Sequence, residues 1–336
     1  MELSIIVPVF NSVGGIAFCL DSLLAQTVSD YEIITVNDAS TDNSLEILQE
    51  YKKKNPDKIR IINLENNIKQ GGARNAGIRY SKGRFIGFVD SDDWIAPDMY
   101  EKLLQKASNT GADVVCCDMF IKHHHDFEPG QAVKMIEDGI QGVLYEKQYQ
   151  RLVLHSGSIV CKIYKREIII ENDLWFPENV FYEDNCTGIL MMLYATHLEK
   201  VDIPLYFYYM NQNSTTHKKN NERMFDRLIT AELLVEEFKK RGFYNKYKDE
   251  LLYRFVELYY ANTLRCYQIY FKKFNYSKLL EMKKKKKDIA SGFNKNKYRK
   301  TMEKKLRILM GLNDISPLLY IVVVYIKRFI KSIFVK

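Results

Sequence analysis

FIGFVDSDDW, residues 85–94, joins an apolar run to a turn that carries three aspartates. The run is hydrophobic at nearly every position, which is typical of a strand buried on both faces of a parallel sheet. Three earlier segments have the same character, namely LSIIVPVF (3–10), EIITVN (32–37) and IRIINL (59–64). These four runs predict the central strands of one sheet.

Helical patterns alternate with these strands, at about residues 14–26, 43–54, 71–81 and 97–109. The β-α-β-α rhythm predicts a doubly wound, Rossmann-like α/β domain, with a mostly parallel central sheet and helices on both faces. VVCCD (114–118) adds a further strand, residues 121–215 show a mixed pattern, and the chain is helical beyond about residue 220. We expect an α/β domain over residues 1–215 and a C-terminal helical region over residues 216–336.

The carboxylates of Asp90, Asp92 and Asp93 follow the strand at its C-terminal end. Ligands of open α/β sheets bind beyond this end of the strands. Three neighbouring carboxylates repel one another, and Mn²⁺ or Mg²⁺, which prefers hard oxygen ligands, would relieve the repulsion and neutralise a diphosphate. The alternative is an acidic turn that caps the helix near Pro97.

Other polar segments should open onto the same edge of the sheet, because they also follow strands. They are residues 8–11 (PVFN), 37–40 (NDAS) and 71–75 (GGARN). Asp38 is a candidate acceptor for the ring N–H of a uracil, and Arg74 is a candidate cation for a diphosphate. The alternatives are that Asp38 helps to cap the second helix and that Arg74 pairs with a surface carboxylate.

Four motifs in order, VPVFN, VNDASTDNS, GGARNAG and FVDSDDW, resemble the signature of the family 2 glycosyltransferases of the GT-A fold. The resemblance is close over residues 1–120 and looser through FPENVFYEDN (176–185) and PLYFYYMNQNST (204–215). It departs from the family pattern at Asn37, where an acid is usual, and at Ala39, where a glycine is usual. Residues 1–120 would then be the nucleotide-sugar half and residues 121–215 the acceptor half.

The resemblance implies an inverting transfer of a sugar to a hydroxyl of a glycan acceptor. The expected donor is a UDP-hexose or a UDP-N-acetylhexosamine. It makes Asp184 the catalytic base, with Glu183 beside it. Asp90 and Asp92 would bind the donor and the metal. The nucleotide-sugar contacts would come from Pro8, Val9, Phe10, Asn11, Asp38, Arg74, Asp90, Ser91 and Asp92.

Glu183 and Asp184 fit that role on chemical grounds too, because a carboxylate can take the acceptor proton. Their alternative role is to complement the dipole of the helix that follows. His217 is a further candidate metal ligand, on a polar segment that could close over the diphosphate; the alternative there is a solvated linker. The run His123 to His125 predicts an exposed loop, because consecutive histidines do not converge on one metal.

Charge is distributed unevenly along the chain. Residues 270–336 have a net charge of +15 and the remainder a net charge of −7. Residues 316–336 combine an apolar stretch, too short to span a bilayer, with Lys327, Arg328 and Lys331. This pattern favours a basic amphipathic helix lying on an anionic membrane surface, although the helix could instead dock on the protein or on a second copy.

A protein of this kind would be cytoplasmic and peripheral on the inner face of the cell membrane, with a lipid-linked glycan or a growing surface polysaccharide as acceptor. A sugar nucleotidyltransferase is the first alternative function, but it would need a Gly-rich basic loop after the first strand, and residues 11–15 (NSVGG) contain no basic residue. The second is a non-enzymatic protein that binds nucleic acid or another anionic surface. We do not expect nucleic acid as a partner, because the positive charge is confined to the C-terminal region.

Overall fold

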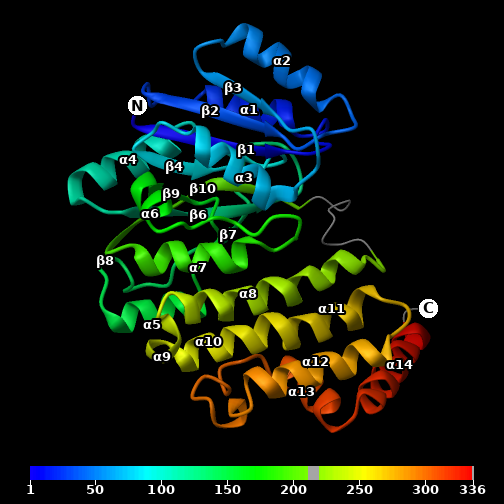
Figure 1. Cartoon of the computed structure of the whole chain (residues 1–336). Helices are drawn as coiled ribbons and strands as arrows, with labels where there is room; N and C mark the ends of the chain where they lie inside the picture. Colours follow the sequence, from blue (N-terminus) through cyan, green and yellow to red (C-terminus); the bar gives the residue numbers. More distant parts are fainter. Residues whose placement is uncertain (211–218, 335–336) are drawn as a thin grey trace. The chain divides into compact units, whose positions relative to one another are not determined.

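The computed structural model describes residues 1–210 and 219–334, with only the backbone described at residues 331 and 334. Two compact units make up the chain, Met1–Asn211 and Gln212–Lys336 (Figure 1). The first is an α/β unit and the second is helical, as the sequence predicts. Each unit is described by itself below.

A ten-stranded sheet forms the centre of the first unit, with the strand order β3-β2-β1-β4-β9-β6-β10-β5. Strands β3, β2, β1 and β4 are parallel neighbours, and β6 and β10 are parallel to each other. Strand β9 runs antiparallel between β4 and β6, so the predicted mostly parallel sheet is confirmed with one reversed strand at its centre. The strands on this path are β1 (Leu3–Val9), β2 (Tyr31–Asn37), β3 (Ile59–Asn63), β4 (Phe85–Phe88), β5 (Trp94–Ile95), β6 (Val114–Lys122), β9 (Lys162–Lys165) and β10 (His197–Tyr209).

Every residue of β1 and β2 is buried, which explains their continuous apolar runs. Helices cover both faces of the sheet. On one face α3 packs so closely that a Cβ at Gly77 would lie 2.4 Å from an Ile6 methyl; on the other face, a Cβ at Gly87 would lie 2.6 Å from the Tyr100 hydroxyl of α4. The helices of the first unit are α1 (Ile16–Leu24), α2 (Ser44–Lys54), α3 (Lys69–Tyr80), α4 (Met99–Thr110), α5 (Glu146–Leu154), α6 (Arg166–Glu171) and α7 (Asp184–Tyr194).

A polar insertion, residues 122–150, follows the main part of β6. It contains the short strands β7 (Gln131–Val133), paired with β6, and β8 (Gly142–Val143), paired with β10. The prediction of an exposed loop is wrong for His125, whose ring stacks on Tyr209 at 4.3 Å and packs on Trp94 at 5.2 Å. Aromatic packing therefore fixes this end of the insertion next to the acidic turn.

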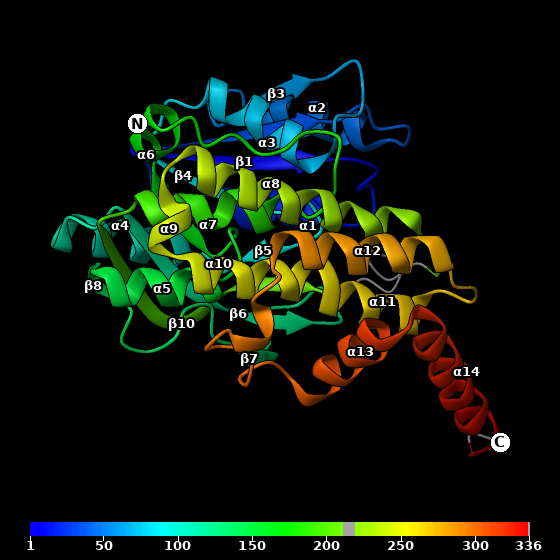
Figure 2. The ribbon, with the colours of Figure 1, turned by 60° about the horizontal axis from the view of Figure 1, so that its bottom comes forward.

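The second unit is a helical bundle (Figure 2). Helix α8 lies beside a long rod formed by α10, the π-helix η3 and α11. In the part of the chain that the structure describes, no helix is both long enough and apolar enough to cross a membrane. The elements of this unit are η2 (Glu222–Phe225), α8 (Asp226–Lys240), α9 (Phe243–Lys246), α10 (Lys248–Phe255), η3 (Val256–Ala261), α11 (Asn262–Tyr270), α12 (Tyr276–Ile289), η4 (Phe293–Lys295), α13 (Lys304–Ile315) and α14 (Pro317–Phe334).

Candidate functional site

The carboxyl ends of β1, β2 and β4 meet at one edge of the sheet because the three strands are adjacent and parallel. The turn after β4 lies against the start of α1. The hydroxyl oxygens of Ser12 and Ser91 are 2.6 Å apart, and a Cβ at Gly15 would lie only 2.9 Å from the Asp92 Cα. Glycine is therefore needed at position 15 for this close approach.

Asp38 is buried at the end of β2. Its Oδ1 accepts the backbone N–H of Ile68 at 2.7 Å, and its own N–H donates to the Val9 carbonyl at 2.8 Å. Burial raises the pKa of Asp38, although the backbone N–H groups of Ile68 and Lys69 oppose this shift. At the neighbouring position, where the family usually has an acid, the Asn37 amide instead donates to Asn63 Oδ1 on β3 at 2.7 Å.

The loop that follows β1 is hydrogen-bonded to the loop that follows β2. Asn11, in the left-handed region with a φ of 51°, donates its backbone N–H to Ser40 Oγ at 3.1 Å. Its side-chain oxygen accepts the N–H of Thr41 at 2.8 Å. Phe10 exposes its ring, whereas Pro8 and Val9 are buried strand residues. Among the candidates at this edge, Phe10 and Asn11 therefore have exposed side chains, and Pro8 and Val9 do not.

The three aspartates after β4 have different environments. Asp93 is buried, and its carboxylate accepts the Tyr206 hydroxyl at 2.6 Å and the Tyr209 backbone N–H at 2.8 Å. Asp90 and Asp92 are half-buried. Burial, together with the charge of Asp90, raises the pKa of Asp92 to about 6. Asp93 thus fastens the turn to β10, and the other two carboxylates remain at the edge.

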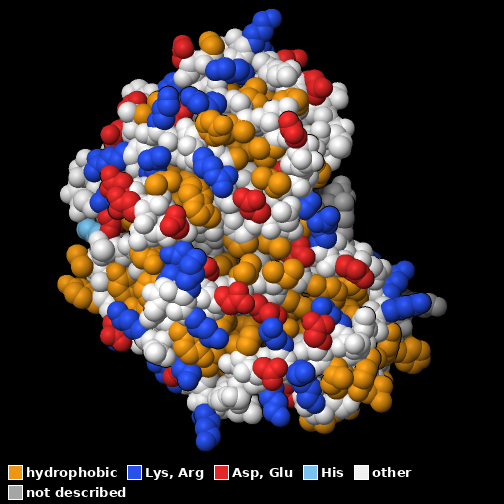
Figure 3. Space-filling model, viewed as in Figure 1, with side chains coloured by type: hydrophobic (Ala, Val, Ile, Leu, Met, Phe, Trp, Pro, Cys, Tyr) orange, Lys and Arg blue, Asp and Glu red, His pale blue; other side chains and the backbone are white. Residues whose placement is uncertain are grey.

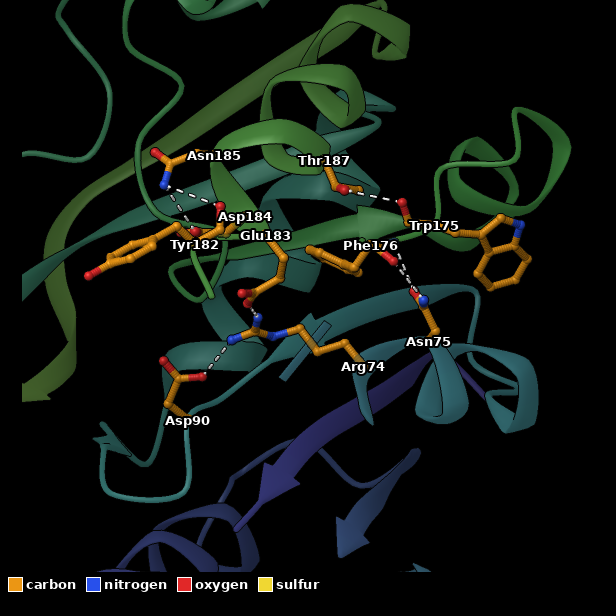
Figure 4. A network of polar contacts seen from close by, with 10 residues as sticks. All are labelled: Arg74, Asn75, Asp90, Trp175, Phe176, Tyr182, Glu183, Asp184, Asn185 and Thr187. Carbon is orange, nitrogen blue, oxygen red and sulfur yellow. Dashed lines mark hydrogen bonds and ion pairs between the residues drawn. The ribbon is translucent and has the colours of Figure 1, made fainter. Parts of the chain in front are cut away.

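Arg74 connects the acidic turn to the acidic pair (Figure 4). It is buried on α3, and its guanidinium donates to Asp90 Oδ1 at 2.8 Å and to Glu183 Oε1. Burial by itself would lower the pKa of Arg74, but Glu183 and Asp90 raise it above its usual value. The alternative of a surface partner for Arg74 is wrong, because both of its partners are carboxylates of the candidate site.

Helix α3 also holds the chain segment that leads to the acidic pair. The Asn75 amide donates to the Phe176 carbonyl at 2.9 Å and accepts the Phe176 N–H at 2.9 Å (Figure 4). A Cβ at Gly71 would lie 2.2 Å from the Pro177 carbonyl oxygen, so only glycine allows this approach. The motif GGARNAG therefore positions residues 176–183 through the close approach of Gly71, the side-chain hydrogen bonds of Asn75 and the ion pair of Arg74.

Glu183 and Asp184 differ in exposure. Glu183 is buried, and burial raises its pKa to about 7 against the opposing effect of Arg74. Asp184 is half-buried at the first position of α7. A residue that the sequence analysis missed lies close to this pair: Lys162 is wholly buried on β9, donates to the Ser158 carbonyl, and interacts electrostatically with Asp184.

Burial, and after it the charge of Asp90, raises the pKa of Asp92. A divalent cation would fit these two carboxylates, because it would neutralise their mutual repulsion. Within residues 1–210 and 219–334, no group of three or more His, Cys, Asp or Glu side chains could hold a metal ion. Further ligands would therefore have to come from elsewhere, such as a bound diphosphate. His217, the third predicted ligand, lies outside the described residues.

Comparisons with known proteins agree with this architecture. The sequence model of "Glycosyl transferase family 2" matches residues 4–172. The uncharacterized glycosyltransferase EpsJ of Bacillus subtilis is 34% identical over 257 residues, which cover 73% of this chain and 70% of EpsJ. The poly(ribitol-phosphate) beta-N-acetylglucosaminyltransferase TarS of Staphylococcus aureus is 26% identical over 278 residues, covering 78% of this chain and 44% of TarS.

Two solved structures share the fold. The crystal structure of TarS residues 1–349 in complex with UDP-GlcNAc has a TM-score of 0.57 at 22% identity, with 90% of this chain and 93% of that chain covered. The mannosyltransferase PcManGT from Pyrobaculum calidifontis, in complex with GDP-Man and Mn²⁺, has a TM-score of 0.51 at 15% identity, with 98% and 87% covered. The predicted family and the predicted fold class are confirmed: the chain belongs to glycosyltransferase family 2.

Proposed function

We propose that this enzyme is a metal-dependent, inverting glycosyltransferase that moves a sugar from a UDP-sugar to a hydroxyl of a glycan acceptor. The observation that carries the proposal is the ion-pair chain in which Arg74 joins Asp90 to Glu183. Asp90 belongs to the turn expected to bind the donor, and Glu183 adjoins the expected base. The proposal explains why a buried arginine connects these two acidic segments.

The donor would bind at the edge formed by the ends of β1, β2 and β4. Asp38 provides a buried carboxylate there, which we propose accepts the ring N–H of uracil. The exposed ring of Phe10 and the polar side chain of Asn11 lie in the loop bonded to Ser40 and Thr41. Ser91 and Arg74 contribute polar groups between this loop and the acidic pair. A uridine nucleotide supplies the N–H donor and the aromatic ring that these groups would recognise.

Asp184 is the proposed base and Glu183 its positioning neighbour. In an inverting transfer the acceptor oxygen bonds to the anomeric carbon while the bond from that carbon to the diphosphate oxygen breaks. The hydroxyl proton passes to a carboxylate as the acceptor attacks. Asp184 is half-buried, whereas Glu183 is buried and bonded to Arg74. The bond between Glu183 and Arg74 stabilises the start of α7. We therefore assign the proton-accepting role to Asp184.

Asp90 and Asp92 would hold Mn²⁺ or Mg²⁺ together with the donor, and the cation would supply neutralising charge for the diphosphate leaving group. The Mn²⁺ in the PcManGT structure supports a metal at this kind of site by analogy of fold. The UDP-GlcNAc in the TarS structure supports a UDP-sugar in the same way.

The proposed acceptor is a lipid-linked glycan or a growing surface polysaccharide, and the proposed location is peripheral, on the inner face of the cell membrane. The strongly basic C-terminal region supports this setting, because anionic lipids attract clusters of Lys and Arg. The name of TarS, which describes a polymeric poly(ribitol-phosphate) substrate, supports a polymer as acceptor.

The test is a screen for UDP release from several UDP-sugars, with Mn²⁺ or Mg²⁺ and without an acceptor. We expect slow, metal-dependent hydrolysis of one donor, since water can replace the acceptor hydroxyl. Removal of the metal with a chelator should stop UDP release. Failure to hydrolyse or bind any nucleotide sugar would contradict the proposal, and formation of a UDP-sugar and pyrophosphate from UTP and a sugar phosphate would identify a nucleotidyltransferase instead.

A further inference from the structure

Helix α14 turns an apolar face away from the rest of the second unit. Tyr320 and Val324 are buried on its inner face, and the Tyr320 hydroxyl donates to the Leu264 carbonyl at 2.6 Å. The opposite face carries exposed hydrophobic residues at every third or fourth position. This apolar stripe consists of Leu318, Leu319, Val322, Tyr325, Ile326, Phe329, Ile330 and Ile333, and Figure 3 shows hydrophobic side chains gathered over this helix.

The cationic side chains of α14 have different environments. Arg328 donates to the carbonyls of Phe271 at 2.6 Å, of Tyr267 at 3.3 Å and of Lys272 at 3.4 Å. These carbonyls lie at the C-terminal end of α11, where a cation is stabilised by the helix dipole. Arg328, one of the three cations expected to meet an anionic membrane surface, is therefore bonded within the second unit instead. Lys327 is exposed, and the side chain at position 331 is outside the described part.

A groove with basic residues adjoins the stripe. It has a volume of about 690 Å³ and an aromatic lining of Phe225, Tyr267, Phe271 and Phe274. Lys272 and Lys273 are exposed at its edge. Lys278 also lines the groove but pairs with Glu281 at 3.2 Å. The other lining residues are Asn220, Glu222 and Asn275. The groove thus presents the two exposed ammonium groups of Lys272 and Lys273 beside an aromatic surface. The carboxylate of Glu222 partly offsets their charge.

The stripe and the groove are fixed to each other within the second unit. The Tyr325 hydroxyl donates to the Lys272 carbonyl at 3.3 Å. The Phe274 ring lies 5.2 Å from the Tyr325 ring, and the Arg328 guanidinium lies 4.9 Å from the Phe274 centroid. Tyr325 belongs to the stripe and Phe274 to the groove. The two features therefore form one continuous surface, apolar along α14 and cationic at Lys272 and Lys273.

We propose that this surface docks the protein on an anionic lipid bilayer. The stripe would lie among the acyl chains near the headgroups, as the apolar face of an interfacial helix does. Lys272 and Lys273 would bind the lipid phosphates. A second copy of the chain is a poorer occupant, because it would bring two basic surfaces together: residues 270–336 have a net charge of +15. An anionic bilayer complements the apolar stripe and the lysines at once.

The inference rests on the proposed function only for its biological setting. Deletion of α14 would be a poor test of it. Deleting α14 would expose the α11 end that Arg328 caps and the cavity that Tyr320 fills. Substitutions of exposed residues avoid this loss of internal packing. Lys272→Gln/Lys273→Gln removes the two exposed charges, and Val322→Ser/Phe329→Ser breaks the stripe. Lys239→Gln/Lys240→Gln is the matched control, because these exposed lysines end α8, roughly 22 Å along that helix from the groove residue Phe225.

The experiment is co-sedimentation of the full chain with phosphatidylcholine vesicles, with and without phosphatidylglycerol. We expect binding that requires phosphatidylglycerol and weakens with salt. The groove variant should bind about 30-fold more weakly, at about 1 kcal/mol for each lysine, and the stripe variant should lose binding, whereas the control variant should match the wild type. Equal binding by the groove and control variants would overturn the role of Lys272 and Lys273.

Two further readouts keep the outcomes distinct. Absence of vesicle binding by the wild type would overturn the inference, and so would a wild-type dimer in solution that the stripe variant converts to a monomer. UDP release is measured on the same preparations, and it should be unchanged in the groove and stripe variants. Vesicle binding without UDP release from any donor would contradict the proposed function while supporting the docking surface.

Discussion

Arg74→Met removes the guanidinium that two carboxylates share. Arg74 and Glu183 are each 3% exposed in their side chains, and Asp90 is 24% exposed, so solvent screens this ion pair weakly. Breaking a buried pair by removing one partner costs about 3–5 kcal/mol, because the remaining charge is left without compensation. For a unit of this size, 1 kcal/mol corresponds to about 2–4 °C in Tm. We therefore expect the Tm of the first unit to fall by about 6–20 °C.

Tryptophan fluorescence during thermal unfolding reports on this unit, because the chain's two tryptophans, Trp94 and Trp175, both belong to it. The matched control is Arg84→Met, which removes an exposed arginine paired with Glu2 at 3.8 Å and should cost no more than about 1 kcal/mol. The double variant Arg74→Met/Glu183→Gln should recover part of the lost stability, since the uncompensated charge at position 183 is gone. An equal loss in the two arginine variants, or no recovery in the double variant, would refute the reasoning.

Three other predictions concern the site. Asp92→Ala should abolish metal-dependent binding of UDP in calorimetry while leaving the Tm near that of the wild type, and unchanged metal-dependent affinity would refute the assignment. Asp184→Asn should keep donor binding but lower transfer by about 10² to 10⁴-fold; near-normal transfer would leave Glu183 as the next candidate for the base. Metal-dependent UDP affinity should fall about tenfold for each pH unit below about 6, because the raised pKa of Asp92 lets protons compete with the cation there. A UDP affinity that does not change between pH 7 and about pH 5 would contradict this prediction.

The strands of the first unit could be predicted from the sequence because burial on both faces produces continuous apolar runs. The runs at residues 3–10, 32–37, 59–64 and 85–90 correspond to β1, β2, β3 and β4, with ends that differ by one or two residues. Adjacent parallel strands share an edge, so the positions of Asp38 and of the acidic turn at one edge also followed from the sequence. Strand β9 could not be identified in this way. It is only four residues long, KIYK, and it buries Lys162, which a polar pattern assigns to the surface.

Contacts between residues that are distant in the sequence could not be predicted from it. Arg74 and Glu183 are 109 positions apart, and Asp93 and Tyr206 are 113 positions apart. Nothing in the sequence near Asp93 distinguishes it from Asp90 and Asp92, and only the position of β10 makes Asp93 a structural carboxylate. The environment of Arg328 in the second unit likewise depends on contacts with a separate helix. A helical pattern shows which residues share a face, but the end of α11 decides that this cation faces inward.

A crystal structure of the wild type with UDP and Mn²⁺ is the measurement that tests the central claim most directly. We expect the uracil ring N–H within hydrogen-bonding distance of Asp38, and the diphosphate and Mn²⁺ beside Asp90 and Asp92, at the edge formed by β1, β2 and β4. UDP bound away from this edge, or bound there with Asp38 and Asp92 out of reach, would contradict the account.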